Sequence, residues 1–141
     1  MVTGSCFLQT EIFATDENLR FLAGSDSYFC DGTFSMCPQL FYQIYTIHSM
    51  IDGKMYPLVY ALLANKRQDT YEQMFQIILD RSRNIGLNLN PSTIFTEFET
   101  AAQNAARIVF NSDVKGCMFH FRQAIWKAVV DSRHYSRTTL L

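Results

Sequence analysis

The sequence predicts a single mixed α/β domain, because segments rich in strand formers come first and segments with helical periodicity follow. The chain has 141 residues, a length that suits one domain. Hydrophobic residues make up 48% of the chain and aromatic residues 14%, which is enough to form a buried core. We assign residues 1–25 to a lead-in segment with a short helix, and residues 26–141 to the domain itself.

The lead-in segment carries one element. Residues 1–15 show no clear period, and we expect them to be poorly anchored. Asp16–Ala23 is expected to form a short helix with Asp16 as its N-cap residue. Gly24 and the polar residues after it end this helix.

Three strands are predicted next, and they form an antiparallel meander. Tyr28–Phe34, Leu40–His48 and Met55–Ala64 are rich in aromatic and β-branched residues. Asp52-Gly53 is a turn signal between the second and the third of these strands. Because Pro57 cannot donate a hydrogen bond to a neighbouring strand, we expect the third strand to lie at a sheet edge.

The period of the apolar residues then changes from that of a strand to that of a helix. Asp69 and Glu72 have the spacing of a helix start, and Gly86 stands where a helix stop is expected. The residues between them form one apolar stripe at helical spacing, made of Tyr71, Met74, Phe75, Ile78 and Leu79. A helix from Asp69 to Gly86 is therefore predicted.

The last third of the chain predicts two more strand–helix units. A short buried strand at Thr93–Thr96 leads into a capping-box sequence, Thr96 to Glu99, and a helix of small residues. A strand at Val114–Phe119 and a helix at His120–Asp131 complete the order β-β-β-α-β-α-β-α. This order matches the ribonuclease H-like core, a mixed sheet whose first and fourth strands are parallel neighbours. The helix Asp69–Gly86 supplies the long crossover between them.

Two acidic positions come together in this topology. Asp31 belongs to the first strand and Glu97 to the end of the fourth, and neighbouring strands lie about 4.8 Å apart. Two carboxylates so close repel each other unless a cation lies between them, and a hard divalent ion such as Mg²⁺ suits carboxylate ligands. Such ions can activate a water or a 3′-hydroxyl for phosphodiester transfer. Gly32 would let a backbone or a substrate approach closely.

The same residues have structural interpretations that leave the site open. Asp31-Gly32 can be a simple turn, and Glu99 fits position N3 of the capping box well enough for capping alone to explain it. His48 is expected to pair with backbone or a neighbouring side chain rather than to act in catalysis. Trp126 could stack on a base, but a Trp beside apolar residues also suits a core.

Charge is divided unevenly along the chain. Residues 1–100 carry six Lys/Arg and eleven Asp/Glu, whereas residues 101–141 carry six Lys/Arg and two Asp/Glu. The basic last third permits a polyanion partner or forms a solvated helix face. No signal peptide and no apolar run of about 20 residues is found, so we expect an intracellular protein without a membrane span. The four cysteines lack C-x2-C spacing and are expected to be reduced.

Several segments together resemble the transposase domain of Mutator-like elements (MULE). They are CDGTF, FYQIYTIH, YPLVYALLANK, YEQMFQ, FTEFETAAQNA and GCMFHFRQAIWK, in the family's order and over about Asp26 to Lys127. The resemblance implies a ribonuclease H-like fold and a divalent-metal Asp-Asp-Glu site for DNA cleavage and strand transfer. It implies Mg²⁺ or Mn²⁺ as cofactor, DNA as partner and a nuclear location. A homo-oligomer is compatible with it, and no membrane partner is expected.

Residue by residue, the resemblance makes Asp31 the first catalytic and metal-binding acid and Glu97 the second. The family's usual second acid is Asp, so Glu97 extends the carboxylate by one methylene, and catalysis is sensitive to displacements of about 1 Å. The third acid lies further downstream in the family, and no Glu follows Glu99 here. The expected domain is therefore C-terminally truncated, with an incomplete triad and weak or absent activity. The alternative is a catalytically dead, domesticated domain that binds DNA or a protein.

The final basic segment supplies further candidates. Cys117 and His120 match a Cys…His feature of the family and are either structural or metal ligands. Arg122 and Lys127 are candidates for contacts to the DNA backbone, which need only positive charge at the surface.

Overall fold

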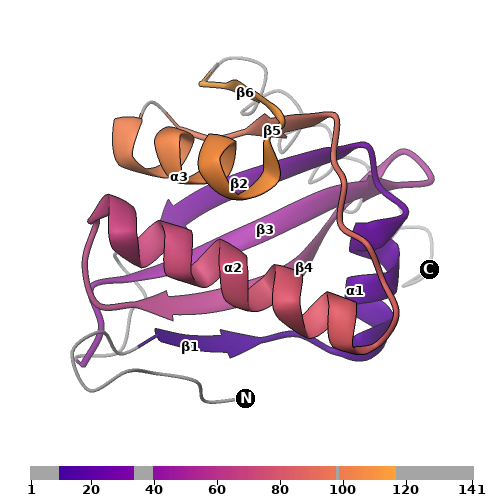
Figure 1. Cartoon of the computed structure of the whole chain (residues 1–141), viewed down its shortest axis with the longest axis horizontal. Coiled ribbons are helices and arrows are strands. Elements are labelled where there is room, and N and C mark those ends of the chain that lie inside the picture. Colours follow the sequence, from indigo (N-terminus) through magenta and orange to yellow (C-terminus); the bar gives the residue numbers. More distant parts are fainter. Residues whose placement is uncertain (1–9, 34–39, 98, 117–141) are drawn as a thin grey trace, which may run out of the picture.

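A computed structural model describes residues 10–33, 40–97 and 99–116 of the chain (Figure 1). Its centre is a six-stranded mixed sheet with the strand order β1-β4-β3-β2-β5-β6. The strands are β1 (Thr10–Phe13), β2 (Ser27–Thr33), β3 (Gln43–Ile51), β4 (Lys54–Leu63), β5 (Thr93–Phe95) and β6 (Asp113–Lys115). The helices are α1 (Asp16–Ala23), α2 (Gln68–Asn84) and α3 (Thr100–Phe110).

The topology confirms the mixed α/β fold class. β2, β3 and β4 form the expected antiparallel meander, and β5 pairs in parallel with β2, so that Phe29 lies opposite Phe95. These are the first and fourth strands of the predicted core. β6 adds a further parallel strand beside β5. The crossover from β4 to β5 runs through α2, as the parallel pairing requires.

The hairpin between β3 and β4 turns at the expected dipeptide. Asp52 and Gly53 have φ values of 51° and 78°, and two successive positive φ values are typical of a type I′ turn. This turn follows the right-handed twist of the two strands it joins. The register of the pair then shifts by one residue between Ile47 and His48.

Two expectations about the edge of the sheet are wrong. β4 is not an edge strand, because β1 pairs with its second half, from Tyr60 to Leu63. The residues before the first helix are therefore anchored from Thr10 onward. Pro57 is compatible with this arrangement because it precedes the part of β4 that β1 covers, so no N–H is needed there. A strand of four residues is too short to show a period in the sequence.

The helix starts also differ from the predicted caps. Thr15, not Asp16, is the N-cap residue of α1, and its hydroxyl accepts a hydrogen bond from the Asn18 N–H at 3.0 Å. α2 begins after Arg67, and Asp69 lies inside its first turn. Asp16 and Asp69 instead lie in the first turns of α1 and α2, where a negative charge stabilises the helix N-terminus. The predicted stop of α2 is confirmed, since Gly86 has a φ of +80° just after the helix.

The three described helices form a layer on one face of the sheet. α2 and α3 lie side by side across it, and α1 packs near the start of β4 (Figure 1). The predicted apolar stripe of α2 is buried in the core, which confirms the periodicity. α3 buries three alanines, Ala102, Ala105 and Ala106. Their small side chains let the backbone of α3 approach its neighbours closely.

The last two predicted elements are covered only in part. The strand predicted at Val114–Phe119 is present only at its start, as β6, which ends at Lys115; Gly116 is not part of it, and residues 117–119 lie outside the described residues. The helix predicted at His120–Asp131 lies outside the described residues. Among the described helices, none combines the length and the apolar composition needed to cross a bilayer.

The alanine face of α3 leads to a stability prediction. Ala105→Leu inserts three carbons where the side chain is fully buried, so we expect a loss of about 1–3 kcal/mol in the free energy of unfolding. Ile108→Leu on the same helix, where the side chain is 62% exposed, should change it by less than about 0.5 kcal/mol. Urea unfolding of both variants measures the difference. Equal unfolding midpoints would contradict close packing of α3.

Candidate active site

The candidate site lies at the border of the sheet formed by the carboxyl ends of β2, β4 and β5, which we call the carboxyl edge. Several chain segments turn from strand to helix there. β2, β4 and β5 all run in the same direction, so their carboxyl ends share this edge. α2 follows β4 and α3 follows β5, which places the start of both helices at the same edge. In open α/β sheets the carboxyl ends of parallel strands are the usual position of a functional site.

The structure brings Asp31 and Glu97 together at this edge. Each lies two residues beyond the ladder pair Phe29 and Phe95, whose rings are stacked with centroids 4.9 Å apart. Side chains alternate along a strand, so the two carboxyl groups extend from the same face as the two rings. A hydrogen bond joins the Asp31 and Glu97 carboxyl groups. On the other side of Asp31, Thr46 of β3 is its partner in the ladder.

The hydrogen bond to Asp31 is the main cause of a raised pKa of the Glu97 carboxyl group. Together with partial burial and the negative charges of Asp31 and Glu99, it raises the pKa of Glu97 from 4.5 to about 7. The positive charge of Lys66, in the loop between β4 and α2, acts in the opposite direction. Near neutral pH the pair is therefore ready to hold one proton between its two carboxyl groups.

Glu99 does not have the capping role that its spacing indicated. α3 begins at Thr100, so Glu99 is the N-cap residue itself, and its side chain makes no capping hydrogen bond to the described backbone. The Glu99 carboxylate instead accepts a hydrogen bond from the Tyr71 hydroxyl at 2.8 Å. The capping-box interpretation is wrong because the helix starts three residues later than that box requires.

Tyr71 connects Glu99 to a buried amide of β3. The Gln43 Nε2 group donates to the Tyr71 hydroxyl at 2.8 Å and to the Asn65 carbonyl at 3.2 Å. Both Gln43 and Tyr71 are fully buried. A Cβ at Gly32 would collide with Gln43 Oε1. The space into which a Cβ at Gly32 would extend is thus occupied by Gln43.

Gln43 and Tyr71 are the contributors to this site that sequence reasoning missed. The periodicity places Tyr71 in the apolar stripe of α2, and its hydroxyl gives no periodic signal. Gln43 carried a usable signal, because a glutamine flanked by strand formers in a buried strand must find hydrogen-bond partners.

His48 is close to the acids but is held by backbone. It pairs with Phe29 in the ladder, and its side chain hydrogen-bonds to the Phe29 backbone. Burial lowers the pKa of His48, while that hydrogen bond and the charge of Asp31 act against the shift. The contact with backbone is the one expected for this residue.

Few of the described side chains near the site could act as metal ligands. In the part of the chain that the structure describes, no cluster of three or more His, Cys, Asp or Glu side chains could hold a metal ion. Asp31 and Glu97 together supply carboxylate oxygens, the ligand type that hard divalent ions prefer. The other proposed site residues, Cys117, His120, Arg122 and Lys127, lie outside the described residues.

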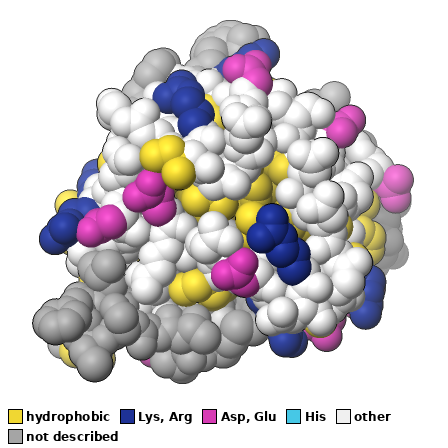
Figure 2. Space-filling model, viewed as in Figure 1, with side chains coloured by type: hydrophobic (Ala, Val, Ile, Leu, Met, Phe, Trp, Pro, Cys, Tyr) yellow, Lys and Arg dark blue, Asp and Glu magenta, His cyan; other side chains and the backbone are white. Residues whose placement is uncertain are grey.

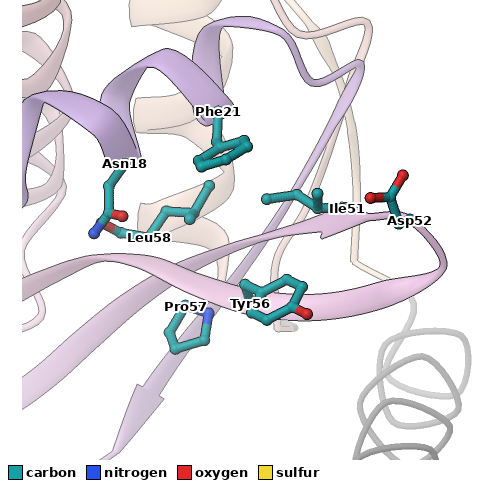
Figure 3. Close-up of a pocket in the computed structure, with 7 residues that line it drawn as sticks. All are labelled: Asn18, Phe21, Ile51, Asp52, Tyr56, Pro57 and Leu58. Atoms are coloured by element: carbon teal, nitrogen blue, oxygen red, sulfur yellow. The ribbon is translucent and has the colours of Figure 1, made fainter.

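A separate hollow lies at the opposite end of β3 and β4. It has a volume of about 290 Å³ between α1 and the hairpin (Figure 3). It is lined by Asn18, Phe21, Ile51, Asp52, Tyr56, Pro57 and Leu58. Asp52 is its single acid and belongs to the hairpin turn, so the hollow offers no pair of catalytic groups.

A family model described as the MULE transposase domain matches residues 27–124 of the chain. The chain belongs to the MULE transposase domain family. The match covers β2 through β6, including both acids, and leaves β1 and α1 outside it. It supports a transposase-derived function for the domain. Searches of curated proteins and of solved structures each gave no match.

The acidity of Glu97 in this MULE domain predicts a pH dependence of stability. Since folding raises its pKa from 4.5 to about 7, the folded state holds the proton more tightly, and its stabilising effect is complete below pH 4.5. We expect that contribution to be lost as the pH rises through about 7. Urea unfolding between these pH values, with wild type compared with Glu97→Gln, measures it.

Glu17→Gln is the control, because Glu17 is exposed on α1 and its variant measures the effect of losing a carboxyl group away from the site. A difference between wild type and Glu97→Gln that stays constant over this pH range would contradict the shared proton.

Proposed function

We propose that this MULE domain derives from a transposase that cleaves and joins DNA with divalent metal, and that Asp31 and Glu97 are two of its metal-binding acids. The observation that supports the proposal is the hydrogen-bonded carboxyl pair at the carboxyl edge of the sheet. The family match covers both residues. Weak or absent cleavage is expected of the chain, because Glu97 replaces the shorter acid that the family uses.

The donor set fits Mg²⁺ or Mn²⁺ with low affinity. Two carboxylates in contact are satisfied by a proton or by a divalent cation, and the cation competes better as the pH rises through the pKa of Glu97. Two protein ligands leave most coordination positions to waters and substrate phosphate oxygens, which Mg²⁺ accepts readily. When bound, the ion supplies Lewis-acid stabilisation of charge on the reacting phosphate.

Asp31 and Glu97 would contribute differently to this site. Asp31 lies within β2, with β3 on one side, so its backbone is fixed by the ladder. Glu97 follows the last paired residue of β5 and depends on the turn into α3 for its position. Asp31 would then set the position of the ion, and Glu97 would complete its protein ligands.

DNA contacts are proposed for the carboxyl edge rather than for the helical face. On the face covered by α2 and α3, Lys and Arg side chains are mixed with Asp and Glu (Figure 2). Lys66 is exposed beside the acids, and Lys115 is exposed at the end of β6 on the same edge. Both could contact phosphate, together with Arg122 and Lys127. Action on DNA makes the nucleus the proposed location, and assembly into a homo-oligomer is compatible with it.

Restoring the shorter acid tests the proposed role of Glu97. We expect Glu97→Asp to raise Mn²⁺-dependent nicking of supercoiled plasmid above wild type, by up to about 100-fold if displacement of the carboxylate limits catalysis. Asp31→Ala and the double variant Asp31→Ala/Glu97→Asp should both show only background nicking. Gel assays with Mn²⁺ and with EDTA measure these rates. Equal nicking by Glu97→Asp and the double variant would overturn the proposed role of Asp31.

A second candidate function is DNA binding without catalysis. It is favoured because, among the described residues, no group of three or more His, Cys, Asp or Glu side chains could hold a metal ion. In this case we expect binding to duplex DNA that weakens steeply with salt and survives Asp31→Ala. Fluorescence anisotropy at two salt concentrations measures it. Lys66→Glu should weaken this binding, and loss of binding in Asp31→Ala alone would contradict the non-catalytic alternative.

A further inference from the structure

Three polar side chains form a continuous hydrogen-bonded chain from β3 to the start of α3. Gln43 Nε2 donates to the Tyr71 hydroxyl at 2.8 Å, and that hydroxyl donates to Glu99 Oε1, also at 2.8 Å. We refer to Gln43, Tyr71 and Glu99 as the relay. Its members come from β3, α2 and the N-cap position of α3, so it connects three elements that are distant in sequence.

The middle of the relay is fixed by packing. Tyr71 is fully buried on α2, and its ring lies 5.2 Å from the ring of Tyr45 on β3. Burial raises the pKa of the Tyr71 hydroxyl, so it stays protonated and keeps its proton for Glu99. The buried ring restricts the movement of its hydroxyl, which takes part in two hydrogen bonds of 2.8 Å.

One end of the relay touches the strand that carries Asp31. Gln43 lies over Gly32, the residue after Asp31, so closely that a Cβ at this position would displace the Gln43 amide. Gln43 Oε1 is buried and has no hydrogen-bond partner among the described residues. Hydrogen bonds of the Oε1 atom therefore do not determine where the amide lies. Its position is set by the bonds of its Nε2 group to Tyr71 and to the Asn65 carbonyl.

The other end holds the turn that carries Glu97. The Glu99 N–H donates to the Glu97 carbonyl at 2.6 Å, and the Gln103 side chain donates to the same carbonyl at 3.3 Å. The Gln103 N–H in turn donates to the Glu99 carbonyl at 3.0 Å. Glu97 has no ladder pair of its own in β5. Its carbonyl also accepts a hydrogen bond from the Thr96 hydroxyl at 3.0 Å, and the Thr96 N–H donates to the Lys115 carbonyl at 3.0 Å, so the bonds around Glu99 and those of Thr96 together hold its backbone.

We infer that the relay fixes the turn bearing Glu97 against the strand bearing Asp31, with Tyr71 as its positioning residue. Gln43 locates the strand at Gly32, Glu99 locates the turn, and the Tyr71 hydroxyl sets the separation between them. The predicted effect on metal binding rests on the proposed function, in which Asp31 and Glu97 bind the metal ion. Glu99 acts here through its hydrogen bond and not as a metal ligand.

The experiment compares removal of two buried hydroxyls. Tyr71→Phe removes the hydroxyl of the relay and keeps the ring. Tyr45→Phe is the matched control, because Tyr45 is also buried, packs against Tyr71 and uses its hydroxyl for a bond to the Cys30 thiol, outside the relay. Calorimetric titration with Mn²⁺ and amide hydrogen exchange are measured for both variants of the full chain.

The inference predicts a difference between the two variants. Tyr71→Phe should weaken Mn²⁺ affinity by about 10-fold, the size typical of losing a group that orients a metal ligand. It should also speed exchange of the Glu99 and Gln103 amides. Tyr45→Phe should leave both properties within about 2-fold of wild type. Equal changes in the two variants would show a general loss of packing and overturn the inference.

Two variants of Glu99 separate positioning from direct ligation. Glu99→Gln keeps an oxygen acceptor for the Tyr71 hydroxyl, so it should retain most of the Mn²⁺ affinity, whereas Glu99→Ala should lose as much as Tyr71→Phe. Equal losses in Glu99→Gln and Glu99→Ala would make the charge of Glu99 the important property and overturn the inference. If wild type binds no Mn²⁺, the proposed function fails, and the exchange rates still decide whether the relay holds the turn.

Discussion

When β2 pairs in parallel with β5, residues equally far beyond the last ladder pair come to lie side by side. In this chain those residues are Asp31 and Glu97. The pairing depends on a long crossover, and α2 provides it by burying its apolar stripe against the sheet. The same burial brings Tyr71 over β3. Strand register, helix packing and the carboxyl pair are thus consequences of one arrangement.

The sequence was sufficient where one physical signal dominated. The apolar stripe of α2 predicted its buried face, Asp52-Gly53 predicted the hairpin turn, and runs of strand formers predicted β2, β3 and β4 within three residues at each end. The parallel neighbours β2 and β5 followed from the order of elements. From that pairing alone, the proximity of Asp31 and Glu97 could be predicted.

Features that depend on tertiary contacts could not be predicted in this way. β1 is four residues long and is stabilised by pairing with β4. The sequence of β1 alone does not predict this pairing. Glu99 matched a local capping pattern, but the Tyr71 hydroxyl provides its actual partner from 28 residues away. The buried amide of Gln43 follows the same rule, since its partners lie on other elements.

β1 also has a consequence for how the domain meets other molecules. It lies before the segment that the family match covers, and it pairs with the second half of β4. A fragment beginning at Ser27 would leave the N–H and C=O groups of Tyr60–Leu63 unpaired along that side. An unpaired strand edge is a template for association with a further strand. β1 instead makes a strand of only four residues the outer strand beside Tyr60–Leu63, and short edge strands are one means by which proteins limit association through sheet edges.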